Sequence, residues 1–141
     1  MNYKTKIIFA LLIILFVTLF TSCANVQVDL SNPEIVVQKF MEAQAVDNRR
    51  VINALLTKEL KAKFKEQKLF LYDREDIPKG SLLDSESILA WDEEDKKVYQ
   101  INYSVQYKLD GETKKLGLKE AVSLTQKDGN WYIDDYVPEK D

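Results

Sequence analysis

The chain has 141 residues, of which 45% are hydrophobic and 30% are charged, and its formal net charge at pH 7 is −3. This length predicts one domain, and a net acidic chain with scattered lysines lacks the basic footprint of a nucleic-acid-binding protein. The sequence contains no histidine, which excludes His-based catalytic triads, imidazole general bases and the usual His-ligated zinc sites.

The first element in chain order is an apolar run at residues 7–20, preceded by Lys4 and Lys6 and by no acid. This run is shorter than the roughly 20 residues that a membrane-spanning helix needs. A basic start, a short apolar run and small residues after it are typical of secretory signal peptides. The segment ends in Phe20-Thr21-Ser22-Cys23, and Cys23 is the only cysteine in the chain.

This ending resembles the lipobox of bacterial lipoproteins, although Phe20 stands where that family prefers leucine. The resemblance implies that the signal peptide, residues 1–22, is removed and that the Cys23 thiol carries diacylglycerol, with an N-acyl chain as a further modification. The domain then lies outside the cytoplasm on the cell membrane, and its net charge is −5 once Lys4 and Lys6 are removed. The alternatives are an ordinary cleaved signal with an incidental cysteine and an uncleaved N-terminal anchor.

Residues 23–31 are expected to form the lipidated cysteine and a short tether, and residues 32–141 a single domain. Ser31 or Asn32 can cap a helix that has Pro33 in its first turn. An apolar stripe at helical spacing follows this start. Its members are Val36, Val37, Phe40 and Met41, followed by Ala43 or Gln44. The polar pair at residues 47–48 ends this helix and can cap the next one.

Apolar residues spaced by four continue through residues 52–64. The hydroxyl of Thr57 can cap a new helix at residue 58, which predicts two helices here, with one long helix as the alternative. This segment carries a group of lysines: Lys58, Lys61, Lys63 and Lys65. They form either a solvated face whose stems cover apolar surface or a contact for anionic lipid headgroups at the membrane surface.

From Ser87 onward the pattern changes to a period of two, which predicts an antiparallel meander after a mixed connection at residues 69–79. The expected strands cover residues 88–91, 98–109, 114–126 and 131–136. In the second strand, alternate residues from Tyr99 to Leu109 are apolar or aromatic and are expected to face the core. The acidic tip at residues 92–95 is interpreted as a solvated hairpin turn and not as a metal site, with a calcium site as the alternative.

Two or three helices followed by such a meander resemble the nuclear-transport-factor-two-like, or cystatin-like, cone. The resemblance extends over residues 32–137 and rests on the opening helix, on Leu56-Thr57-Lys58-Glu59-Leu60 and on the strand that begins Trp131-Tyr132-Ile133. It implies an α+β domain in which the helices pack on a curved four-stranded sheet. Members of this group include isomerases, dehydratases and binding adaptors, so the fold does not by itself predict the function.

Glu120 stands on the otherwise apolar face of the third strand, and Tyr103 lies on the neighbouring strand. Enzymes of the resembled group pair a carboxylate base with tyrosine or carboxylic-acid donors, which makes Glu120 and Tyr103 the candidate catalytic residues. The structural alternatives are a β-bulge near Lys119 that turns Glu120 to solvent, and a pairing of Glu120 with a lysine. Trp91 and Trp131 are expected to pack in the core.

These features favour a non-catalytic binding or accessory module of the cell envelope, with no cofactor apart from the lipid. The alternatives are a pocket for a small apolar ligand and an isomerase-like enzyme. A protein partner predicts an exposed apolar patch on the open sheet face, against which the polar residues from Gln100 to Lys108 argue. An apolar ligand predicts a deep cavity beside Tyr103, and an enzyme predicts Glu120 inside that cavity.

Overall fold

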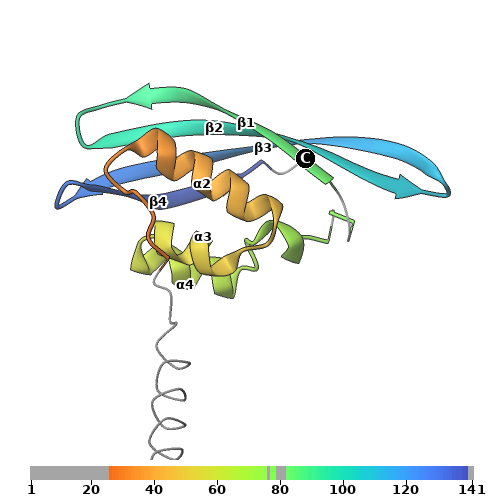
Figure 1. Ribbon diagram of the computed structural model, residues 1–141, viewed down its shortest axis with the longest axis horizontal. Coiled ribbons are helices and arrows are strands. Elements are labelled where there is room, and N and C mark those ends of the chain that lie inside the picture. Colours follow the sequence, from red (N-terminus) through yellow and green to blue (C-terminus); the bar gives the residue numbers. More distant parts are fainter. Residues whose placement is uncertain (1–25, 76, 79–81, 140–141) are drawn as a thin grey trace, which may run out of the picture.

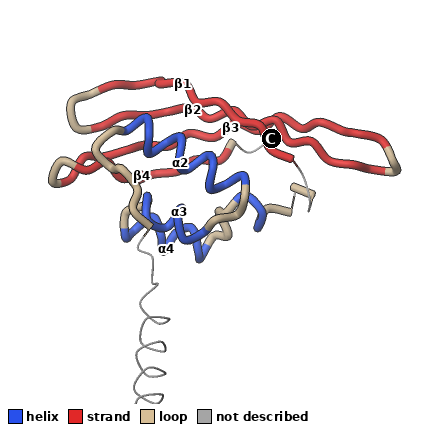
Figure 2. The backbone as a smooth tube through the Cα atoms, viewed as in Figure 1, coloured by secondary structure: helices blue, strands red, loops and turns tan. Residues whose placement is uncertain are grey.

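The computed structural model describes residues 26–75, 77–78 and 82–139. The helical elements among them are α2 (Pro33–Ala45), α3 (Arg49–Leu55), α4 (Lys58–Glu66) and the 3-10 turn η1 (Leu71–Asp73). The strands are β1 (Leu82–Asp92), β2 (Lys96–Leu109), β3 (Glu112–Lys127) and β4 (Asn130–Pro138). They form an antiparallel sheet in the order β1-β2-β3-β4. The helices cover one face of this sheet (Figures 1 and 2), which confirms the predicted α+β class for the described residues.

Each of the three helices begins at a polar side chain that accepts a backbone hydrogen bond. Asn32, Asn48 and Thr57 accept from N–H groups in the first turns of α2, α3 and α4 at 2.9, 3.2 and 3.4 Å. Thr57 also donates its backbone N–H to the carbonyl of Ile133 at 2.9 Å, which fixes the break between α3 and α4 against β4. The predicted division at Thr57 is confirmed, and the alternative of one long helix is wrong.

All four strands are longer than the sequence pattern predicted, and β1 differs most. It begins at Leu82 and not at Ile88, because the segment before Ile88 pairs continuously with β2 from Leu82↔Gln106 onward. This segment contains Asp84 and other residues that are depleted in strands, so its own sequence gave no strand signal.

The core lies between the helices and the inner face of the sheet. The inner side chains of β2 are buried from Tyr99 to Val105 at every second position, as predicted, whereas Leu109 lies beyond the core and is exposed. Phe40 of α2 and Phe64 of α4 meet edge to face with ring centroids 6.3 Å apart. Both rings also contact Tyr136 of β4, so aromatic packing joins the helices to the sheet.

A β-bulge in β1 gives Trp91 an environment different from that of Trp131. Leu89 pairs with Tyr99 on the core side, but Trp91 pairs with Val98, so the extra residue between them turns Trp91 to the outer face. Trp91 is 57% exposed and Trp131 is 4% exposed. The prediction of a core position is therefore confirmed for Trp131 and wrong for Trp91.

The segment before α2 is attached to the domain. Val28 and Leu30 pack against the core, and the Leu30 carbonyl accepts a hydrogen bond from the Trp131 N–H at 2.7 Å. The orange segment at residues 26–32 leads from the start of α2 to the side of the molecule where α3 and α4 lie, away from the sheet (Figure 1). The predicted signal peptide and Cys23 lie outside the described residues.

Candidate functional site: a buried carboxylate and an open apolar face

Glu120 occupies a regular position in the middle of β3. It pairs with Ile101 of β2 and Pro138 of β4, and the nearest register shift in this strand lies between Ser123 and Leu124. The suggested bulge near Lys119 is therefore wrong. The side chain of Glu120 points into the core and has 0% relative exposure.

Two side chains from distant parts of the chain contact the Glu120 carboxylate. The Tyr136 hydroxyl donates a hydrogen bond to Oε1 at 2.5 Å, and Nη1 of Arg74 lies 3.4 Å from the same oxygen. Oε2 has no hydrogen-bond partner among the described residues. The sequence analysis gave pairing of Glu120 with a lysine as one alternative, but the cation beside Glu120 in the structure is Arg74.

Tyr103 is buried near this group. The negative charge of Glu120 contributes to the raised pKa of Tyr103, so the structure brings the two predicted residues into one cluster. The Tyr103 hydroxyl nevertheless makes no hydrogen bond within the described part of the chain. Tyr136 is therefore the tyrosine with a direct hydrogen bond to Oε1, while Tyr103 lies close enough to the carboxylate to lower the pKa of Glu120.

Burial has the largest effect on the pKa values of Glu120, Tyr103 and Tyr136. It raises the pKa of Glu120 above its ordinary value of 4.5, against the opposing effects of the Tyr136 hydrogen bond and the positive charge of Arg74. Burial and the nearby carboxylate raise the pKa of Tyr103 and of Tyr136, so both phenols stay protonated at neutral pH. The group can hold a proton on Glu120 more readily than a solvated carboxylate can.

The sequence interpretation missed Arg74 and Tyr136. Tyr136 shares the core-facing side of β4 with Ile133 only because Asp134 is the extra residue of a bulge, so strict alternation misplaces it. Arg74 belongs to the mixed connection before the sheet, which has no periodicity, and it lies 46 residues from Glu120 in the sequence.

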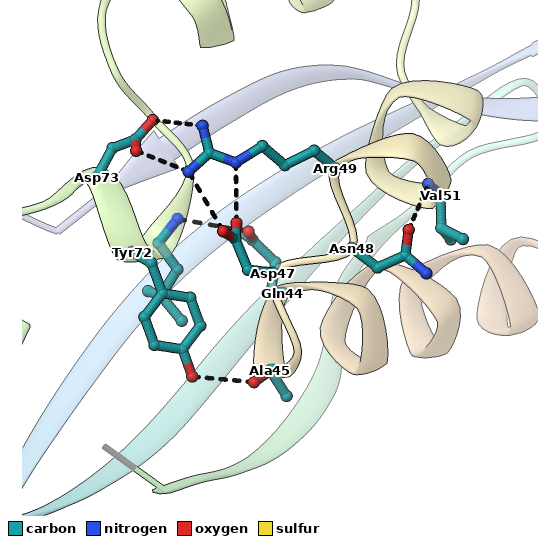
Figure 3. Close-up of polar contacts among 9 residues, drawn as sticks. Gln44, Ala45, Asp47, Asn48, Arg49, Val51, Tyr72 and Asp73 are labelled. Carbon is teal, nitrogen blue, oxygen red and sulfur yellow. Dashed lines mark hydrogen bonds and ion pairs between the residues drawn. The ribbon is translucent and has the colours of Figure 1, made fainter. Parts of the chain in front are cut away.

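A second polar cluster holds η1, and with it the segment that carries Arg74, against the α2–α3 corner (Figure 3). Arg49 donates to Asp73 at 2.7 and 3.1 Å and to Asp47 at 3.0 Å. Its guanidinium also lies 4.6 Å from the centre of the Phe70 ring. The Tyr72 hydroxyl donates to a backbone carbonyl at the end of α2 at 2.9 Å. This bidentate arrangement fixes the connection between helices and sheet.

The hollow beside Tyr103 does not contain Glu120. It has a volume of about 320 Å³ and is lined by polar residues of the outer sheet face, among them Glu86, Asn102 and Ser104. The sealed carboxylate side chain lies on the opposite side of the sheet. General acid–base chemistry needs a group within hydrogen-bond reach of the substrate, and the buried position of Glu120 does not offer that contact.

The outer face of the sheet carries an exposed apolar patch. We define the outer patch as Ile88, Trp91, Val98, Ala121 and Val137. Two cross-strand rows contain these residues, one running from Ile88 through the polar Gln100 of β2 and Ala121 to Val137 and the other joining Trp91 to Val98. Ile88 and Val137 are 54% and 55% exposed. Val98, Ala121 and Val137 of this patch line a hollow of about 380 Å³ together with Ala90, Gln100, Lys119, Glu120 and Glu139, while the Glu120 side chain itself is sealed on the core side. The polar residues of β2 do lie on this outer face, and Gln100 stands within the patch, whose apolar members come mostly from the other strands.

The lysines of α4 do not all point the same way. Lys63 forms an ion pair with Asp135 of β4 at 3.3 Å. Lys58, Lys61 and Lys65 are exposed, and their spacing of three and four residues places them in one row along the helix. The predicted membrane-contact group is thus divided by the structure into a row of three and one lysine paired to the sheet.

The acidic tip at residues 92–95 is a solvent-exposed turn in which the Glu93 N–H donates to the Lys96 carbonyl at 2.8 Å. Within the described ranges, no three His, Cys, Asp or Glu side chains are grouped so that they could hold a metal ion. No helix in the described part of the chain has the length and apolar character to cross a bilayer. Neither a known protein family nor a curated protein matches this sequence.

Proposed function

We propose that this chain is a lipid-anchored lipoprotein on the extracytoplasmic side of the cell membrane, and that its domain is a non-catalytic binding module of the envelope. The basic start, the apolar run and the cysteine that follows them support the anchor. Acylation of Cys23 would hold the domain to the bilayer. The helix-on-meander arrangement is compatible with the nuclear-transport-factor-two-like cone, whose members include binding adaptors.

The observation that carries the binding role is the outer patch. Isolated exposed apolar residues are common, but a contiguous group on an open sheet face is typical of an interaction surface. Ile88, Trp91 and Val137 are each more than half exposed. By contrast, the Glu120 carboxyl, whose pKa burial raises, is sealed in the core, which favours a structural role for it over an isomerase-like one.

The position of the tether supports an outward orientation of the patch. Residues 26–32 lead from the start of α2 toward the side where α3 and α4 lie, and the sheet lies on the opposite side (Figure 1). Because Val28 already packs against the domain, the tether from Cys23 to Gln27 spans at most about 18 Å. A lipid on Cys23 would hold the helix layer near the membrane and leave the outer patch facing a partner.

The anchor is tested by labelling cells with an alkyne fatty acid and comparing the wild type with Cys23→Ala. We expect lipid label and membrane fractionation for the wild type, and loss of both for the variant. Label that persists in Cys23→Ala, or an unlabelled wild type, would contradict the anchor.

The binding role is tested by site-specific photocrosslinking in cells at Ile88 and Val137, which lie at opposite sides of the outer patch. Lys108, at the exposed β2–β3 end of the sheet, is the matched control position. We expect one shared protein partner from both patch positions and none from the control. Crosslinks to a small lipophilic molecule would instead favour the ligand-pocket alternative, and equal products at all three positions would contradict a binding face.

A further inference from the structure

We propose that β1 accepts an extended, lysine- or arginine-rich segment of a partner protein as a fifth strand of the sheet. The apolar side chains of that segment would lie beside Ile88 and Trp91, the members of the outer patch on β1. This inference rests on the proposed binding function and names the chemistry of the partner.

The free edge of β1 provides the backbone for such a pairing. β1 is 11 residues long and, among the described residues, pairs only with β2. An edge strand presents unpaired N–H and C=O groups that can bind another extended chain. Addition of a strand gives affinity through the backbone and specificity through alternate side chains.

Apolar side chains are exposed on both sides of this edge. Ile88 and Trp91 belong to the outer patch, and Leu89 on the other side is 42% exposed. An added strand would place alternate side chains beside Ile88 and Trp91 on one face and beside Leu89 on the other. The bulge that exposes Trp91 thus extends the apolar surface to the edge.

The charge around the edge selects a cationic partner. Between Leu82 and Asp95 the chain carries six carboxylates and no lysine or arginine. The carboxylates are Asp84, Glu86, Asp92, Glu93, Glu94 and Asp95. Glu34 lines the same hollow as Leu89 and Asp92, and Lys97 of β2 pairs with Asp92. A basic segment would therefore meet a negative potential along the whole edge.

The same charges disfavour a second copy of this chain as the occupant. Pairing of two β1 strands would bring together two segments that each carry these carboxylates and no compensating cation. Like charges on adjacent strands are destabilising. The edge is therefore protected against self-association and remains open to a strand of opposite charge.

The test uses residues 24–141, which contain every core residue that the structure describes, and a synthetic peptide of alternating lysine and valine as long as β1. Binding is followed by the fluorescence of Trp91, which is exposed. We expect a blue shift with the basic peptide, and none with the same peptide carrying glutamate for lysine or a central proline.

The protein variant Glu93→Lys/Glu94→Lys should weaken peptide binding about tenfold, since each exposed charge pair contributes up to about 1 kcal/mol. Glu59→Lys/Glu66→Lys on α4 makes the same change in net charge away from the edge and should leave binding unchanged. Equal weakening by both variants, equal binding of the proline peptide, or no binding of the basic peptide would each overturn the inference.

Two further measurements separate this inference from the proposed function. Sedimentation equilibrium should give a monomer, and a dimer that Ile88→Lys dissociates would overturn the inference in favour of a second copy. If crosslinks at Ile88 and Val137 share a partner and the segment crosslinked at Ile88 is not basic, the inference fails and the binding function stands. If those positions share no partner, the binding function itself fails.

Discussion

At the scale of single residues, Glu120 is a carboxylate whose side chain is sealed in the core. A carboxylate on the core face of a central strand loses its hydration, and burial raises its pKa. Tyr136 and Arg74 recover part of the lost solvation through one oxygen, while Oε2 has no partner among the described residues. Such a partly satisfied buried acid makes stability depend on pH.

Glu120→Gln should therefore stabilise the domain increasingly as pH rises. Because the folded pKa is above the ordinary value of 4.5, the folded state binds the proton more tightly than the unfolded state. The wild type then loses unfolding free energy as pH rises from about 4.5 through the folded pKa, and the glutamine variant does not lose this contribution. Urea unfolding of both proteins between about pH 4 and pH 8 measures the difference. A difference that grows toward acid pH would contradict this prediction, and the exposed Glu112→Gln is the control.

The two tyrosines near Glu120 should respond differently to loss of the hydroxyl. Tyr136→Phe removes the donor to a buried carboxylate and should lower the unfolding free energy by about 1.5–3 kcal/mol. Tyr103→Phe removes a buried hydroxyl that has no partner in the described structure, so its effect should be near zero or stabilising. Denaturant unfolding at neutral pH compares them, and a larger loss for Tyr103→Phe would show that Tyr103 is the donor.

At the scale of elements, α4 has apolar side chains on its buried face and lysines on its exposed face. Leu60 and Phe64 are buried against the core, while Lys58, Lys61 and Lys65 form an exposed row. The helix lies in the layer that the tether approaches (Figure 1). Lys58, Lys61 and Lys65 are therefore the lysines that would contact anionic lipid, if the helix face is a lipid contact and not only a solvated face.

Lys58→Glu/Lys61→Glu/Lys65→Glu should weaken binding of residues 24–141 to phosphatidylglycerol vesicles by about a hundredfold. Each lysine near an anionic surface contributes about 1 kcal/mol, and the effect should vanish at high salt. The matched control is Lys108→Glu/Lys114→Glu/Lys115→Glu at the far end of the sheet. Vesicle sedimentation measures both, and an equal loss in the control would reject a specific role for α4.

At the scale of the whole molecule, one core joins both layers. Phe64 of α4 contacts Phe70 and Tyr136 with ring centroids 5.3 and 4.9 Å away, and the α3–α4 break bonds directly to β4. Helices and sheet therefore depend on the same packed rings and should unfold together.

Phe64→Ala should lower the unfolding free energy by about 3–5 kcal/mol, because it leaves a cavity among these rings. Unfolding should nevertheless remain one transition, with helical circular dichroism and Trp131 fluorescence coincident in a Trp91→Phe background. Val46→Ala, at an exposed position after α2, is the control and should change little. Separate midpoints for the two signals would mean that the layers unfold independently.

The sequence by itself determined the elements whose signals are local. The capping side chains are next in sequence to the helices that they begin. The alternation in β2 and β3 predicted which side of these strands faces the core, and Glu120 lies on that side. Only the tertiary structure decided features that depend on register or on contacts between distant segments. One extra residue in β1 or β4 reverses the direction of the side chains after it, which exposed Trp91 and brought Tyr136 to Glu120. Arg74 reaches the same carboxylate across 46 residues, a contact that no local period encodes.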